Sequence, residues 1–233
     1  MKYFKEIKVW DDEICYKHVI NLVRGITNLL KQKNIDKLYF LDIGANVGKV
    51  YDLIKDVYDV EKVWMYEASP LLYEYLEDKY KDDDKVVTNH VAISNEEGYI
   101  NFNEESIKQQ IKNGYEYTPG DEFNFGLSKI ANSKESVKVR TSKLSSLIDD
   151  EILNNVSFIK IDTENFDFYI LEDLLTIIDK FSIKPIIEFE VNWNASPLSR
   201  EDASIILDKF TDLGYEKLTL DDCGGDGILI PLF

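Results

Sequence analysis

The stretch that decides the fold is residues 38–49, LYFLDIGANVGK. An apolar run of strand length meets Asp42, and a turn that contains Gly44 and Gly48 comes next. From Val47 onward, the apolar residues recur at helical spacing. This succession is the first strand, turn and helix of a βαβ unit, so we expect an α/β fold.

The turn itself indicates a kind of ligand. It reads Asp-x-Gly-x-Asn-x-Gly, so Asn46 stands where a dinucleotide site has its central glycine. Because that glycine brings backbone amides against a pyrophosphate, its absence favours a ligand without phosphates. S-adenosylmethionine is such a ligand, and its amino acid end could meet Asp42 and the amides of the turn. The alternative is that Gly44 and Gly48 serve only a tight turn.

Length and composition favour one domain over residues 1–233, because no linker rich in Pro, Gly or Ser divides the chain. With 27 basic and 44 acidic residues, the formal net charge is -17. Such a charge repels a phosphate backbone or an anionic membrane surface, so we expect neither nucleic acid nor a membrane as partner. Nothing in the composition indicates an oligomeric state.

The two cysteines lack the spacing of a metal site, and no apolar run resembles a signal peptide or is long enough to span a bilayer. We therefore expect a cytoplasmic protein. Residues 12–32 carry apolar side chains at alternating spacings of three and four, which predicts an amphipathic helix. We expect residues 1–36 to form a helical extension that packs on the sheet.

The second strand, residues 62–66, ends in Glu67, 25 residues after Asp42. In nucleoside-binding α/β folds, an acid about 20 residues past the glycine turn binds the ribose hydroxyls. Glu67 fits this role, and a solvated acid at a strand end is the alternative. Ser69 and Pro70 are placed to cap and open the next helix.

The third strand and its exit, residues 86–94, would bring the carboxyl end of that strand beside the adenine of such a ligand. His90, Val91 and Ala92 are candidates for that pocket, and His90 could equally be a structural histidine. A short alternating strand over residues 98–102 follows.

Residues 104–135 lose periodicity, and a long irregular segment inside a compact domain is often functional. Aromatic, acidic and amide side chains together suit a carbohydrate, since sugar rings stack on aromatic rings. We expect this segment to bind an acceptor, with Tyr115 and Tyr117 among the contacts. Packing of these aromatic side chains under the segment itself is the alternative.

A second chemical signal lies in the strand VSFIKIDTE, residues 156–164. A buried parallel strand should be apolar on both faces, so Lys160 requires an anionic partner. Asp162 lies two residues on, hence on the same face, at the carboxyl end where ligands bind. Glu164 follows directly, and the three charged residues together predict a site.

The carboxyl-terminal part continues the alternation of helices and strands. A helix is expected over residues 166–179, then a strand over residues 184–193 with Glu190 near its carboxyl end. Ser199 begins the last helix with a capping-box pattern, and two closing strands follow at residues 215–220 and 228–230.

Together these motifs resemble the FkbM-type family of S-adenosylmethionine-dependent methyltransferases, in order from about Leu38 to the carboxyl terminus. The segments that resemble the family are LDIGANVG (41–48), YEASP (66–70), VAISNEEG (91–98), FIKIDTE (158–164), and Pro185 with Glu190 five residues later. The segment YEASP resembles the motif with which this family binds the ribose of its cofactor, which implies that Ala68 contacts the cofactor together with Glu67.

Three departures accompany the resemblance. Asn165 and Asp167 replace the usual glycine and glutamate, and Ser145 replaces an acid in the segment 143–147. An amide usual two residues before Ala92 is replaced by His90.

The resemblance implies a Rossmann-like class I fold, with a seven-stranded, mostly parallel sheet, helices on both faces and an antiparallel last strand. It also implies O-methylation of a hydroxyl on a sugar or a glycosylated metabolite, that is, a small-molecule or glycan acceptor. We hypothesise that Asp162 or Glu164 takes the hydroxyl proton while Lys160 orients that acid or stabilises the alkoxide. Glu190 would bind the acceptor.

Three alternatives stay open. Asp162, Glu164 and Glu190 could hold a divalent metal ion that acidifies the hydroxyl, although a metal is not the favoured interpretation. An NAD-dependent oxidoreductase would share the fold and the ribose acid, but the central glycine is absent. A catalytically silent module that binds S-adenosylmethionine is indicated by Asn165 and Asp167.

Overall fold

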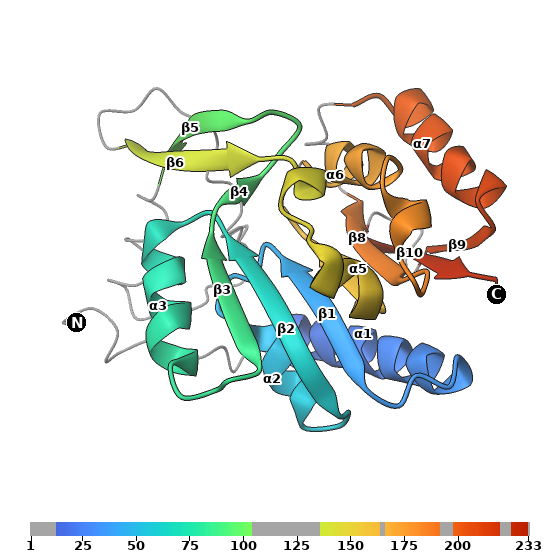
Figure 1. Cartoon of the computed structure of the whole chain (residues 1–233), viewed down its shortest axis with the longest axis horizontal. Helices are drawn as coiled ribbons and strands as arrows, with labels where there is room; N and C mark the ends of the chain where they lie inside the picture. The colour runs from blue at the N-terminus through green and yellow to red at the C-terminus, as the bar shows by residue number, and fades with distance from the viewer. Residues whose placement is uncertain (1–12, 104–135, 164–165, 192–197, 220–224, 233) are drawn as a thin grey trace.

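The structure is a computed structural model that describes residues 13–103, 136–163, 166–191, 198–219 and 225–232. Its main feature in these residues is a seven-stranded sheet (Figure 1). In spatial order, the strands are β3 (Val86–His90), β2 (Val60–Glu67), β1 (Leu38–Ile43), β7 (Phe158–Ile161), β8 (Ile186–Val191), β10 (Gly225–Pro231) and β9 (Tyr215–Thr219).

Strands β3, β2, β1, β7 and β8 pair in parallel. Strand β10 pairs antiparallel with both β8 and β9, so the expected antiparallel last strand is confirmed. Parallel strands end at one edge of a sheet, and Figure 1 shows β1, β2 and β3 running to the same edge. The residues after each strand therefore meet there.

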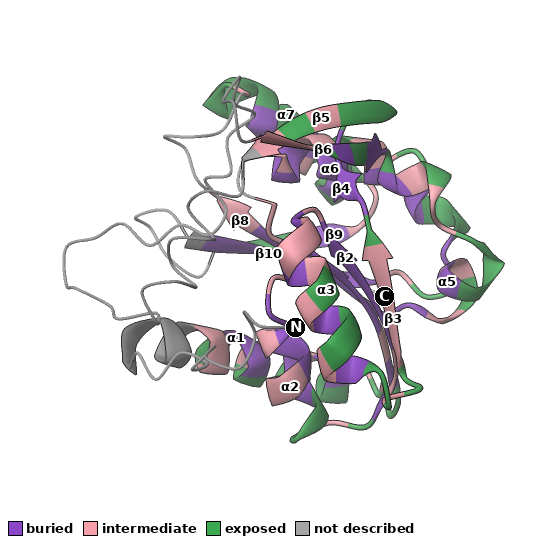
Figure 2. Cartoon of the chain, turned by 90° about the vertical axis from the view of Figure 1, so that its left-hand side faces the viewer, coloured by how far each residue is buried: buried purple, intermediate pink, exposed green. Residues whose placement is uncertain are grey.

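Helices cover both faces of the sheet, as expected. One face carries α1 (Glu13–Gln32), α2 (Lys49–Lys55) and α3 (Pro70–Tyr80), and the other carries α5 (Asp150–Asn155), α6 (Asp167–Leu174) and α7 (Arg200–Asp212). Figure 2 shows the strands largely buried between these helices. Because both faces are covered, the strands are apolar on both sides.

The two faces form two apolar cores. On the face of α1 and α2, Phe40 and Phe158 lie side by side from β1 and β7, with ring centroids 5.8 Å apart. On the opposite face, Phe168 of α6 packs edge-on against Phe189 of β8 at 5.7 Å. Burial of these side chains holds the helices on the sheet.

A second, three-stranded sheet was not expected. Its order is β4 (Ala92–Ile93), β6 (Ser136–Ser142) and β5 (Gly98–Asn103), so the exit of the third strand forms a strand of its own in another sheet. The chain turns at Val91, whose N–H donates to the carbonyl oxygen of Asn89, two residues back, at 3.2 Å, and Ala92 then pairs with Thr141 of β6. Figure 1 shows this small sheet beyond the carboxyl ends of β2 and β3.

Two further differences concern helices. The helix expected to reach Asp179 ends at Leu174, because Thr176 and Ile177 donate three residues back, and a short 3₁₀ turn, η3 (Ile178–Lys180), follows. Helix α5 was not expected; it has six residues and is capped by Asp149, which accepts from the N–H of Ile152.

The predicted caps Ser69 and Ser199 are confirmed, each accepting a backbone N–H in the first turn of its helix. Of the helices in the described ranges, none combines the length and the apolar character that a membrane crossing requires.

Candidate functional site

The site begins where β1 and β7 end, because the two backbones come unusually close at Gly44. A Cβ atom at Gly44 would lie 1.9 Å from the carbonyl oxygen of Asp162, and the φ of Gly44 is +77°. The N–H of Asp162 donates to the carbonyl oxygen of Ile43 at 3.0 Å. Glycine is therefore required both for the turn and for the approach of the strands.

Residues 44–48, which we call the cofactor loop, are held against the end of β2. The N–H groups of Gly44 and Ala45 both donate to the carbonyl oxygen of Tyr66, at 2.9 and 3.1 Å. The N–H of Asn46 donates to Glu67 at 2.8 Å. The loop amides of Gly44, Ala45 and Asn46 thus already have partners inside the protein.

Glu67 connects this loop to α3. Its two carboxylate oxygens accept from the N–H groups of Asn46 and Ser69, both at 2.8 Å, and the residue is 7% exposed. Burial raises the pKa of Glu67 to about 7, although the two N–H donors act in the opposite direction. Since each carboxylate oxygen has two lone pairs, each can still accept a hydrogen bond from a hydroxyl group.

Asn46 has an unusual conformation and an orphaned acceptor. Its φ is +53°, and its side-chain oxygen Oδ1 is buried without a hydrogen-bond partner among the described residues. A buried polar atom without a partner is costly, so this oxygen calls for a donor from a ligand. Together, Asn46 and Glu67 fit a nucleoside cofactor with two ribose hydroxyls.

Lys160 lies at the centre of the charged part of the site. Its ammonium group is 3.3 Å from Asp162, 3.4 Å from Asp42 and 3.1 Å from the carbonyl oxygen of Gly44. The expected pairing of Lys160 with Asp162 is confirmed. Burial by itself lowers the pKa of Lys160, but Asp162 and Asp42 outweigh burial and raise it above the usual range. Lys160 is therefore a permanent cation.

The two acids beside Lys160 differ in exposure. Asp42 is 0% exposed, whereas the side chain of Asp162 is 43% exposed. Burial raises the pKa of Asp42, and Lys160 opposes that shift. Of these two acids, Asp162 is thus the one that a substrate can reach, whereas Asp42 is enclosed and contacts Lys160.

More acids follow across the sheet on the same face. Glu188 of β8 is in register with Lys160, and Asp226 of β10 is in register with Glu190. Glu188 is 2% exposed, and burial, together with Asp226, raises its pKa well above the usual value. Glu190 therefore lies two residues nearer the carboxyl end of the sheet than the level of Lys160, and its role at an acceptor stays a prediction.

The adenine candidates lie on the other side of Glu67. His90 is exposed and stacks on Tyr73, with ring centroids 4.9 Å apart, and its Nε2 atom is 3.2 Å from the carbonyl oxygen of Ala68. Val91 and Ala92 are buried beside it. The structure therefore brings Ala68, His90, Val91 and Ala92 together at the ends of β2 and β3.

Some predicted residues lie outside the described part of the chain. These are Glu164 and the acceptor candidates Tyr115 and Tyr117, and their roles stay predictions. Within the described ranges, no group of three His, Cys, Asp or Glu side chains is arranged to hold a metal ion. The set of Asp162, Glu164 and Glu190 also stays a prediction, because it includes Glu164.

Sequence reasoning missed four residues that the fold brings to this site. The sequence could have indicated Glu188, because it precedes Glu190 by two residues in a strand and so lies on the same face of the sheet. No local sequence pattern indicated Asp226, since its neighbour Glu190 is set by the pairing of β10 with β8. Lys79 and Tyr80, at the end of α3, contact the cofactor loop and had no signal in the local sequence.

The sheet order, the glycine loop after β1 and the acid at the end of β2 define a Rossmann-like class I methyltransferase fold. The methyltransferase FkbM domain matches residues 42–217, and the chain belongs to this family. The predicted resemblance is thereby confirmed, and membership of the family implies S-adenosylmethionine as cofactor.

Solved structures agree on the fold. Methyltransferase FkbM from Methylobacillus flagellatus KT has a TM-score of 0.53 and 17% identity, covering 83% of this chain and 44% of that one. This chain thus spans less than half the length of that protein. The METTL16 MTase domain has a TM-score of 0.53 at 7% identity, covering 93% and 68% of the two chains.

A human methyltransferase 10 domain containing protein has a TM-score of 0.50 at 9% identity, covering 97% of this chain and 86% of that one. At such identities, these likenesses show the fold alone. Comparison with curated proteins gave no match.

The close approach at Gly44 leads to a stability prediction. Gly44→Ala should lower the free energy of unfolding by on the order of 2 kcal/mol or more, because of the clash with Asp162 and the positive φ. Gly25→Ala is the matched control: nothing lies within 4 Å of its Cβ position in α1, so alanine should stabilise by about 0.5–1 kcal/mol. Urea unfolding measures both, and a Gly44→Ala midpoint equal to that of the wild type would contradict the prediction.

The raised pKa of Glu67 leads to a pH prediction. Because its pKa rises from 4.5 to about 7, the folded state binds more protons than the unfolded state between these values. The contribution of Glu67 to the free energy of unfolding is therefore full below pH 4.5 and declines, by on the order of 3 kcal/mol, as pH rises through about 7.

Glu67→Gln cannot titrate, so the stability difference between wild type and variant should shrink or reverse from about pH 5 to about pH 8. Urea unfolding of both proteins across this range measures that difference. Taking the difference removes the titration of the other buried acids, and a constant difference would refute a raised pKa at Glu67.

Proposed function

We propose that this chain is an S-adenosylmethionine-dependent O-methyltransferase that acts on a hydroxyl of a sugar or a glycosylated acceptor. The observation that carries the proposal is the position of Asp162, a reachable acid paired with a permanent cation at the edge of the sheet, beside the nucleoside-binding features of Asn46 and Glu67. Membership of the FkbM methyltransferase family supports the reaction class.

The cofactor residues fall into two groups. Glu67 would accept hydrogen bonds from the ribose hydroxyls, and the orphaned Oδ1 of Asn46 would accept one further donor. Val91 and Ala92 would border the adenine, with Ala68 and His90 next to them. When bound, S-adenosylmethionine supplies an electrophilic methyl group on a sulfonium.

The chain's own residues would activate the acceptor. Asp162 would take the proton from the hydroxyl as the oxygen attacks. A general base must lie within hydrogen-bonding distance of that proton, and the exposed carboxylate of Asp162 can be approached by an acceptor. Glu164 is the alternative base. Lys160 cannot serve as base, since it stays charged; it would hold Asp162 in place and stabilise negative charge on the oxygen.

The acids around Lys160 also fit a cationic donor. Asp42 and Asp162 both contact Lys160, at 3.4 and 3.3 Å, so two carboxyl groups accompany one ammonium group. A sulfonium is a cation and is favoured by negative neighbours. Glu190 lies at the outer level, where an acceptor hydroxyl could donate to it.

Thermal unfolding tests the cofactor. S-adenosylhomocysteine at about one hundred times its Kd should raise the free energy of unfolding by about 2.7 kcal/mol, because it binds only the folded chain. NADH should leave the unfolding temperature unchanged, since the loop lacks the central glycine. Stabilisation by NADH without stabilisation by S-adenosylhomocysteine would favour an oxidoreductase and defeat the proposal.

Substitution tests the base. Asp162→Asn should lower kcat with a sugar acceptor by about 10²–10⁴-fold, because the asparagine amide cannot take a proton, while the Kd for S-adenosylhomocysteine changes little. Release of S-adenosylhomocysteine measures turnover. Asp208→Asn is the matched control, because Asp208 is also an exposed acid paired with a lysine: its side chain is 65% exposed and lies 2.7 Å from Lys217 of β9. Full turnover in Asp162→Asn would remove Asp162 as base and leave Glu164.

A further inference from the structure

We propose that Lys79 and Tyr80, at the end of α3, are positioning residues that hold the cofactor loop in its binding conformation. The inference rests on the proposed use of S-adenosylmethionine. Its basis is that both side chains reach across from α3 to backbone carbonyl groups of the loop.

The contacts are direct. Lys79 donates from Nζ to the carbonyl oxygen of Val47 at 2.6 Å, and Tyr80 donates from Oη to the carbonyl oxygen of Gly48 at 2.9 Å. Both carbonyl groups immediately follow Asn46 in the chain. Two successive peptide units of the loop are thus anchored to one helix, about thirty residues further along the chain.

Asp52, in the first turn of α2, joins the two donors. One of its oxygens accepts from Lys79 at 2.6 Å, and the other lies 3.0 Å from the Tyr80 hydroxyl, whose single hydrogen is shared between Asp52 and the carbonyl oxygen of Gly48. Burial lowers the pKa of Lys79 and raises the pKa of Tyr80, which fits groups withdrawn from water. Lys55 also contacts Asp52 at 3.2 Å, so the acid has cations on two sides.

This network supports a loop with an unusual backbone. Asn46 and Gly48 have φ values of +53° and +72°, in the left-handed region that few residues other than glycine and asparagine adopt. A Cβ atom at Gly48 would lie 2.3 Å from the hydroxyl of Tyr80, so the ring fits the glycine closely. Fixing the carbonyl groups on either side of Gly48 would keep Asn46 turned so that its N–H meets Glu67 and its Oδ1 stays directed to a ligand.

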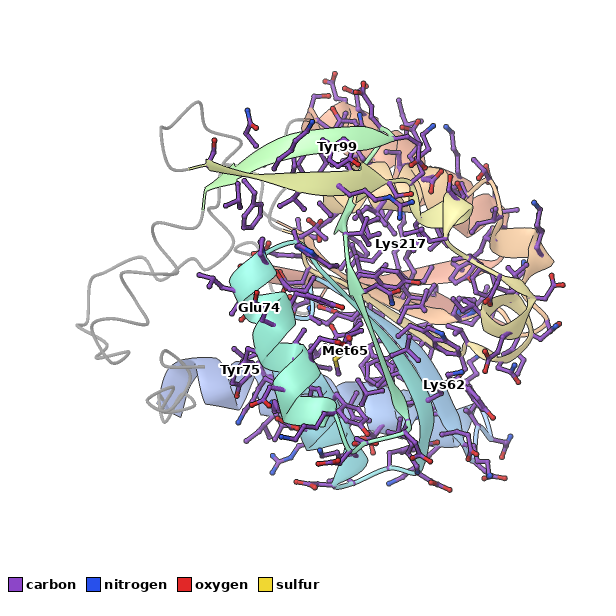
Figure 3. The ribbon with its side chains drawn as sticks, turned by 60° about the vertical axis from the view of Figure 1, so that its left-hand side comes forward. Lys62, Met65, Glu74, Tyr75, Tyr99 and Lys217 are labelled. Atoms are coloured by element: carbon purple, nitrogen blue, oxygen red, sulfur yellow. The ribbon has the colours of Figure 1, made fainter. Side chains whose placement is uncertain are left out.

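Packing around the network is apolar and keeps it in place. Tyr80 meets the ring of Tyr51 edge-on, with centroids 5.4 Å apart. Tyr75, one turn earlier on α3 and labelled in Figure 3, packs against Val47 and Leu72, and Met65, also labelled there, belongs to the core that includes Tyr80. The helix is therefore a fixed support for the loop.

Titration calorimetry with S-adenosylhomocysteine on the full chain tests the inference. Tyr80→Phe removes one hydroxyl, and Lys79→Met removes one ammonium group; each should weaken binding at least fivefold. Lys79→Arg should restore most of the affinity because it can still donate to Val47. Lys81→Met is the matched control, since Lys81 contacts only Asp78 among the ion pairs of the described residues, and its Kd should stay within twofold.

Urea unfolding of the same variants separates positioning from a purely structural role. If Lys79 and Tyr80 only fasten α3 to α2, stability falls while the Kd of the folded variants stays within twofold of wild type, and this result would overturn the inference. Weakened binding in variants that are fully folded at the assay temperature supports it. A wild-type chain that binds no S-adenosylhomocysteine would overturn the proposed function and this inference together, whereas equal binding by wild type and variants overturns the inference alone.

Discussion

The buried ammonium group of Lys160 is the interaction on which the site depends. It joins the end of β1, the cofactor loop and the end of β7, through Asp42, the carbonyl oxygen of Gly44 and Asp162. A buried charge is tolerated only when its partners are close, and removal of one partner costs about 3–5 kcal/mol. The two central strands must therefore end at the same level, and the exposed acid is placed beside the loop as a consequence.

The backbone of the cofactor loop is held by hydrogen bonds to two neighbouring elements, β2 and α3. Its amides donate to Tyr66 and Glu67, its carbonyl groups accept from Lys79 and Tyr80, and these contacts come from two other elements, β2 and α3. Within this loop, the Oδ1 atom of Asn46 is a buried side-chain acceptor without a partner among the described residues. Such an acceptor, in a loop held by two neighbouring elements, is suited to a ligand with a matching donor.

The second sheet lies next to the site, beyond the carboxyl ends of β2 and β3. Strand β3 stops at His90 because the chain turns at Val91, whose N–H donates two residues back to Asn89, and β4 then joins β6 beyond the carboxyl ends of β2 and β3. Tyr99 of β5 is 65% exposed and is labelled in Figure 3 on this small sheet. Asn103 of β5 and Ser136 of β6 pair with each other, and they flank residues 104–135, which the sequence predicts to bind an acceptor.

Local sequence determined much of this protein. The glycine turn after an apolar strand, the caps Ser69 and Ser199, and Lys160 followed by Asp162 were readable because each depends on neighbours within a few residues. Tertiary structure alone decided the rest. Three features depend on which distant strands and helices pack together: the pairing of Asp226 with Glu190, the departure of β4 from the main sheet, and the contact of Tyr80 with the loop. The periodicity of one segment predicts its own secondary structure but not the segment it packs against.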